Sequence, residues 1–205
     1  MSLARSARLM LVVMATAALA ACGINSVPTK EEAAKARWAD VESAYQRRAD
    51  LIPNLVATVR GGAESELAIL TEVTEARSRA SSVQIDADDL SNPEQFQQFE
   101  AAQGELSGAL SRLLVTVEAY PQITSSRGYD DLRTALESAE NRIDNARTKY
   151  NAAVQDYNTE IRVFPSSIGA NIIHGAEPME AFKAEAGANE APDIDAADLT
   201  PTGGN

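Results

Sequence analysis

The sequence predicts an all-α fold: an elongated antiparallel four-helix bundle followed by a disordered C-terminal tail. Apolar residues recur at alternating three- and four-residue spacing over most of the chain, with almost no strand pattern. Proline and paired glycines separate these stretches by mostly short joints. The final segment is rich in Glu, Asp, Ala, Gly and Pro and has almost nothing apolar to bury.

The first two helices should lie in the N-terminal half of the chain. The first is expected to begin after Thr29 as its N-cap, because Pro28 should break any earlier helix. Its apolar stripe crosses Pro53, so we expect a kink near Ala49 or a helix that restarts there. The second helix is expected over residues 63–82, and an acidic linker follows it.

The third helix has clear signals at both ends. Ser91 or Asn92 should cap it, with Pro93 in the first turn. Tyr120 precedes a proline and should end it. Between these ends the apolar seam is interrupted only by Gln103.

The fourth helix should be the longest, over residues 128–164. Its seam is a sustained heptad pattern in which aromatic residues alternate with alanines. Three seam tyrosines are expected in the core with outward-reaching hydroxyls, the alternative being a ligand-lined groove: Tyr129, Tyr150 and Tyr157. On the third helix, Gly104 and Gly108 lie four residues apart and should permit a neighbouring helix to approach closely.

The N-terminus indicates secretion and membrane attachment. Residues 1–21 combine a basic start with a short apolar stretch, as in a signal peptide. The sequence LAACG at 19–23 resembles the lipobox of bacterial lipoproteins, which implies cleavage before Cys22 and lipidation of that residue, as with palmitate. The alternative is an ordinary signal peptide with a chance cysteine. We expect a lipidated tether over 22–29, the bundle over 30–167, and a weakly ordered to disordered acidic tail over 168–205.

Composition excludes several classes of function. The formal charge is −12, and removal of Arg5 and Arg8 with the signal peptide makes it −14. Such a surface repels phosphate backbones and anionic lipid, so no nucleic acid partner is expected. Lipidation would consume Cys22, the single cysteine, and His174 is the single histidine. We therefore expect no metal or cofactor and no enzymatic activity.

A polar cluster beside the proline is the candidate interaction surface. It contains Arg47, Arg48, Asp50 and Asn54, whose spacing permits contacts on one helix. One interpretation is a recognition surface at a kink. The other is structural: Asp50 and Asn54 bond the backbone groups freed by Pro53, and the arginines are solvated or paired with another helix.

A second charged cluster lies on the fourth helix. It comprises Glu140, Asn141, Arg142, Asp144 and Arg147. Acid–base catalysis by these carboxylates would need an apolar cleft, and none is evident in the sequence. We interpret them as solvated helix charges or as an ion pair between helices, such as one between Asp144 and Arg147.

Motifs in every expected helix resemble the LemA family over residues 31–167. The matching segments are 38–42 (WADVE), 46–56 (QRRADLIPNLV), 74–77 (TEAR), 110–114 (LSRLL), 118–121 (EAYP), 140–143 (ENRI), 146–147 (AR), 150–151 (YN), 156–158 (DYN) and 164–166 (FPS). The resemblance implies a four-helix bundle and membrane association, commonly through an N-terminal hydrophobic helix that the lipobox replaces here. It implies no settled biochemical activity.

The function predicted from these features is a lipoprotein of the cell envelope that acts as a non-enzymatic scaffold or adaptor for other envelope proteins. The alternative is a carrier of an apolar ligand between bundle helices, and a hydrolase comes third. The protein should be extracytoplasmic; with Gly23 after the cysteine, the periplasmic face of the outer membrane is favoured if the source has two membranes. Heptads on the fourth helix leave a homo-oligomer open.

Overall fold

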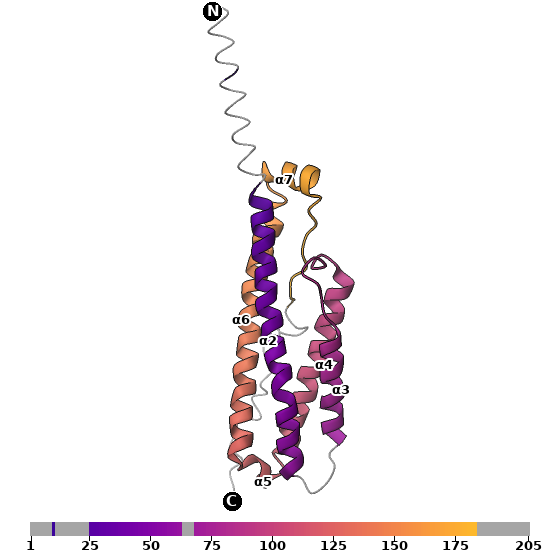
Figure 1. Cartoon of the computed structure of the whole chain (residues 1–205), viewed down its shortest axis with the longest axis vertical. Helices are drawn as coiled ribbons and strands as arrows, with labels where there is room; N and C mark the ends of the chain where they lie inside the picture. The colour runs from indigo at the N-terminus through magenta and orange to yellow at the C-terminus, as the bar shows by residue number, and fades with distance from the viewer. Residues whose placement is uncertain (1–9, 11–24, 63–67, 184–205) are drawn as a thin grey trace, which may run out of the picture.

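The structure is a computed structural model that describes residues 10, 25–62 and 68–183. Every regular element in this part of the chain is helical (Figure 1), which confirms the all-α prediction. Four long helices run alternately up and down the molecule: α2 (Ser26–Gly62), α3 (Ala68–Ser82), α4 (Pro93–Val117) and α6 (Arg127–Glu160). Short helices α5 (Pro121–Thr124) and α7 (Ser166–Gly169) lie at opposite ends, and α7 continues into the π-helix η1 (Ala170–His174).

The start of α2 differs from the prediction. The helix begins at Ser26, so residues 26–29 of the expected tether are helical. Pro28 lies in the first turn, where a missing backbone N–H costs no hydrogen bond. Thr29 is therefore not the cap; its hydroxyl donates to the carbonyl of Asn25 at 2.8 Å.

Pro53 does not break α2, which is continuous through it. Proline has no N–H to give to the carbonyl four residues earlier, that of Ala49. The Arg77 side chain of α3 supplies the missing donor, its Nε lying 2.8 Å from the Ala49 oxygen. The carbonyl freed by Pro53 thus becomes a contact between α2 and α3.

Capping side chains fix the starts of α4 and α6, whereas both helices end earlier than predicted. Asn92 caps α4 as expected, accepting from two backbone N–H groups, with Pro93 as the first residue. Ser126 caps α6 in the same manner. The helix α4 stops at Val117, three residues before the predicted end, and α6 stops at Glu160, four before. Of the predicted second helix, residues 63–67 lie outside the described residues.

The core has two parts, one above the other along the bundle. The part near α7 is rich in aromatic residues and centres on Trp38, which contacts the rings of Phe96, Phe99, Tyr150 and Phe182. The part near α5 is almost wholly aliphatic and is built by α2, α3, α4 and α6 together with Ile123 of α5. Deep burial of these side chains provides most of the stabilisation.

The C-terminal segment after η1 contradicts the prediction of a weakly ordered tail from residue 168. Residues 175–183 pack on α6, and the side chains of Met179 and Phe182 enter the aromatic core. Residues 184–205, also predicted to be disordered, lie outside the described part of the chain.

Two Tyr-Asn pairs, one heptad apart on α6, hold this segment by its backbone. Asn151 exchanges two hydrogen bonds with the backbone of Phe182, both at 2.9 Å, and Asn158 does the same with Met179. The hydroxyls of Tyr150 and Tyr157 donate to the carbonyls of residues 180 and 177. Burial raises the pKa of the Tyr150 phenol, which keeps that donor protonated. The seam tyrosines are thus core residues, as expected.

We predict that the asparagine contacts hold residues 175–183 in place. Asn158→Ala removes two hydrogen bonds to the Met179 backbone and should lower the free energy of unfolding by about 1–3 kcal/mol. Hydrogen exchange of the Met179 amide should accelerate in the same variant. Gln155→Ala, an exposed amide on the same helix, is the control. Equal exchange rates of the Met179 amide in both variants would contradict this role of Asn158.

We also predict that stability falls in acid partly through Glu160. Its carboxylate accepts hydrogen bonds from Ser166, where α7 begins, and from Ser26, where α2 begins, and these bonds lower its pKa from the ordinary 4.5. The stabilisation is therefore present above the unfolded-state pKa and is lost as the pH falls through the folded-state pKa. Melting temperatures from pH 7 to pH 3 should fall less steeply for Glu160→Gln than for the native protein; parallel curves would refute this role.

Candidate functional site

Arg48 lies at the centre of the bundle, between the two parts of the core. Its side chain is 1% exposed although it carries a charge, which is uncommon for arginine. One helical turn before it, Tyr45 belongs to the aromatic part, and one turn after it, Ile52 belongs to the aliphatic part. A polar layer therefore interrupts the apolar interior at this level.

The partners of Arg48 come from two other helices. Its guanidinium donates to Glu140 of α6 at 3.0 Å, to the Ser107 hydroxyl of α4 at 2.7 Å and to the Gln103 side chain of α4 at 2.7 Å. Gln103 in turn donates to the Ala80 carbonyl of α3 at 3.3 Å. We call Arg48, Gln103, Ser107 and Glu140 the buried polar layer; with Ala80, it joins all four long helices.

Tyr45 adds to this arrangement from the side. The Arg48 guanidinium lies 5.1 Å from the centre of the Tyr45 ring, within range of a cation–π contact. Burial raises the pKa of the Tyr45 phenol. One donor of the guanidinium, Nε, is buried and has no hydrogen-bond partner among the residues that the structure describes.

A groove opens over the polar layer between α4 and α6. Its volume is about 930 Å³, and Arg48, Gln103 and Glu140 line it. The groove exists because α2 packs mainly on α6, and α3 on α4, while α4 and α6 have little direct contact. Gly104 lines its wall, and a Cβ there would meet no atom within 4 Å. At Gly108 a Cβ would meet the Arg112 side chain of the same helix at 3.4 Å and no neighbouring helix, so the close helix approach expected at Gly104 and Gly108 is wrong.

Charged side chains of both signs form the rim of the groove. The α4 side contributes Glu100, and the α6 side contributes Arg133, Asp144 and Arg147. Arg147 approaches Glu100 at 3.9 Å and lies over the Phe182 ring at 4.5 Å, so the expected pair with Asp144 gives way to contacts with α4 and the C-terminal segment. Glu140 pairs with Arg48, and the second predicted cluster is thus an ion-pair region between helices.

The predicted interaction surface is divided by the structure. Arg47, Asp50 and Asn54 are exposed, whereas Arg48 is buried and faces α4 and α6. Asp50 accepts from Gln46 at 2.7 Å, and the carbonyl freed by Pro53 is bonded by Arg77, so the structural role expected of Asp50 and Asn54 belongs to another helix. Cys22, the predicted lipidation site, lies outside the described residues.

Sequence reasoning missed Gln103 and Arg77 as functional side chains of the fold. Gln103 had a visible signal, since it alone interrupts the apolar seam of its helix. Its pairing with Arg48 depends on the relative height of two helices, which no local pattern encodes. Among the described residues, no helix is both long and apolar enough to cross a bilayer, and no three metal-binding side chains come together.

We predict that Glu140→Ala destabilises the bundle by about 2–3 kcal/mol, because it leaves the buried Arg48 charge without its carboxylate. Glu137→Ala, three residues earlier, removes a surface pair with Arg133 and should cost under about 0.5 kcal/mol. Urea unfolding of the two variants measures the difference. Equal losses would show that the polar layer contributes no more than a surface ion pair.

Comparison with known proteins places this architecture in one family. The sequence model of the LemA family matches residues 37–195. Among curated proteins, the chain is similar to the magnetosome proteins MamQ 1 and MamQ 2 of Paramagnetospirillum magneticum, each 30% identical over 69% of this chain and 58% of the relative. The magnetosome protein MamQ of Magnetospirillum gryphiswaldense is 28% identical over 86% of this chain and 68% of its own length.

The matched region thus spans a little over half of the first two relatives. The family and these relatives support a membrane-associated helical protein, and no enzymatic activity follows from their names. The family match extends from α2, through the polar layer and the Tyr-Asn pairs, to beyond the docked C-terminal segment. The chain therefore belongs to the LemA family.

Proposed function

We propose that this protein is a non-enzymatic scaffold of the bacterial envelope that is held on the membrane by lipid on Cys22 and docks other envelope proteins along the groove between α4 and α6. The observation that carries the proposal is the groove itself. It is the place where two neighbouring long helices are left apart, directly above a buried charged residue.

The groove is suited to a polypeptide. It runs between two helices, has leucines from α4 and α6 along its length, and carries charges of both signs at its rim: Leu110, Leu114 and Leu136 among apolar residues, and Glu100, Arg133, Asp144 and Arg147 among charged ones. Protein interfaces combine an apolar centre with a polar rim in this way.

The position of the anchor supports the same function. α2 begins at Ser26, four residues after Cys22, and ends at the far end of an elongated bundle (Figure 1). A lipid on Cys22 would hold one end of the bundle at the membrane, since four extended residues reach only about 14 Å. The groove would then be presented away from the bilayer, where other envelope proteins can reach it.

A carrier of an apolar ligand between the helices is the second candidate, and the groove fits it less well. An apolar molecule placed there would desolvate Glu100, Glu140 and Arg147 without returning hydrogen bonds to them. The apolar interior on either side of the polar layer is already filled by packed side chains.

We predict that a photo-crosslinking residue at Ser111, on the α4 side of the groove, captures a defined envelope protein in cells. The same residue at Glu75, exposed on α3, is the control and should give no such product. Cys22→Ala should abolish the Ser111 product, because the unanchored protein no longer meets its partner at the membrane. Mass spectrometry identifies the product; capture of lipid alone would favour the carrier.

A further inference from the structure

The end of the bundle where α2 begins carries a concentrated apolar surface. Phe164 is 80% exposed, Ile172 is 78%, Ile173 is 59% and Ile168 is 52%. We call these four residues the apolar cap. Elsewhere in the described part of the chain, Met10 and Val115 are the large apolar side chains that are exposed to a similar degree.

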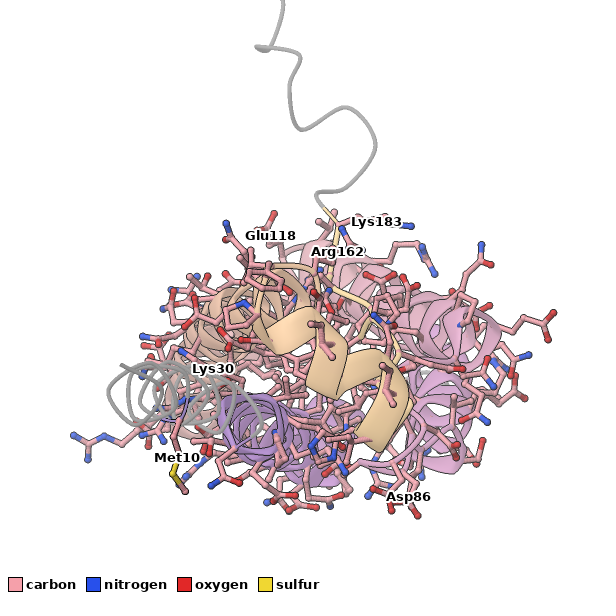
Figure 2. The ribbon with its side chains drawn as sticks, turned by 90° about the horizontal axis from the view of Figure 1, so that it is seen from above. Met10, Lys30, Asp86, Glu118, Arg162 and Lys183 are labelled. Atoms are coloured by element: carbon pink, nitrogen blue, oxygen red, sulfur yellow. The ribbon has the colours of Figure 1, made fainter. Side chains whose placement is uncertain are left out.

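The cap is an outward-facing surface built on a fixed helix. Helices α7 and η1 lie across the end of the bundle (Figure 2). Their inner face is buried, with Ala170 completely so and Ser166 bonded to Glu160 at 2.6 Å. The isoleucines on the outer face have no such partner, since they are half or more exposed. An apolar surface of this kind on a soluble face is costly unless something covers it.

Charge distribution points to the nature of the covering partner. The chain has 30 acidic residues, yet none lies between Glu160 and Glu177. The same interval contains Arg162 and His174, both exposed at this end. A helix with apolar residues outward, a basic neighbour and no carboxylate of its own is suited to the interfacial region of a bilayer.

Chain connectivity places that bilayer at this end. Ser26 begins α2 beside α7, and its hydroxyl and that of Ser166 both donate to Glu160. Cys22 is four residues before Ser26, so a lipid on it would lie within about 14 Å of the start of α2. The apolar cap and the first residue of α2 therefore belong to the same end of the molecule (Figures 1 and 2).

We propose that the apolar cap inserts into the membrane interface as a second contact and stands the bundle upright on the bilayer. This proposal rests on the membrane anchor of the proposed function, and it adds a site that fixes the orientation. With a single flexible attachment, the bundle could lie flat. Insertion of the apolar cap sets the bundle axis along the membrane normal, so the groove between α4 and α6 runs away from the bilayer.

The test is the depth of a spin label on the full chain, purified from membranes and placed in vesicles of phosphatidylethanolamine and phosphatidylglycerol. A label at Ile172→Cys should collide more with oxygen and less with a water-soluble nickel complex. A label at Val115→Cys, on the far end of α4, should show the reverse. Equal exposure of both labels to the nickel complex would overturn the proposal that the apolar cap inserts into the membrane.

A second variant controls for the possibility that the spin label itself prefers lipid. With the label at residue 172, Ile168→Ser and Ile173→Ser together should shift the label toward water, whereas Val115→Ser should not. Both isoleucines are exposed, so folding should persist, which the circular dichroism spectrum checks. An unchanged depth in the double variant would overturn the proposal.

The lipid anchor on Cys22 is tested by measurements separate from those that test the apolar cap. Vesicle flotation reports attachment, and mass spectrometry of the labelled protein reports whether the Cys22 sulfur is acylated or free to take a second label. Flotation with a free Cys22 would overturn the lipid anchor while the depth at residue 172 still decides the cap. Absence of flotation would overturn both.

Discussion

The buried charge of Arg48 is the constraint around which the bundle is arranged. An arginine taken out of water needs acceptors from several directions, and here a carboxylate, a hydroxyl and an amide on two other helices provide them. Meeting these acceptors sets the heights of α4 and α6 relative to α2. Gln103 also donates a hydrogen bond to the Ala80 carbonyl, so the same requirement sets the height of α3 relative to the other three long helices. A purely apolar seam would allow neighbouring registers, which the polar layer excludes.

The polar layer also separates two halves with different architecture. Toward α5, four helices close an aliphatic core in the ordinary manner of a bundle. Toward α7, the chain completes the core with an extended segment, whose Met179 and Phe182 pack among aromatic rings. An extended backbone cannot satisfy its own hydrogen bonds, so it needs donors and acceptors from a neighbour. Asn151 and Asn158 supply both, which explains why Tyr-Asn pairs recur one heptad apart on α6.

Periodicity and capping residues predicted the long helices because these signals are local: Asn92 followed by Pro93 identifies the start of α4 wherever the helix packs. Three of the departures are nonlocal. Pro53 suggested a kink or a restart of the helix, but a donor from α3, Arg77, makes the continuous helix favourable. Residues 175–183 belonged to the segment predicted to be weakly ordered; only two of their side chains are buried, and the rest of their stabilisation comes through the backbone. Arg48 looked like part of a surface cluster, since its burial depends on partners 55 and 92 residues away.

Arrangement along the bundle axis ties these features to a role at a membrane. The end of the bundle where α2 begins has the aromatic core, the docked C-terminal segment and the exposed isoleucines of α7 and η1. Glu160 joins the first residue of α2 to the first residue of α7, so the start of α2 and the apolar cap form one rigid end. The groove lies farther along, where α4 and α6 part over Arg48. A partner bound there would be held at a fixed height above the lipid. That height is set by the same buried charge that fixes the register of the helices, so the scaffold's geometry and its stability have a common origin.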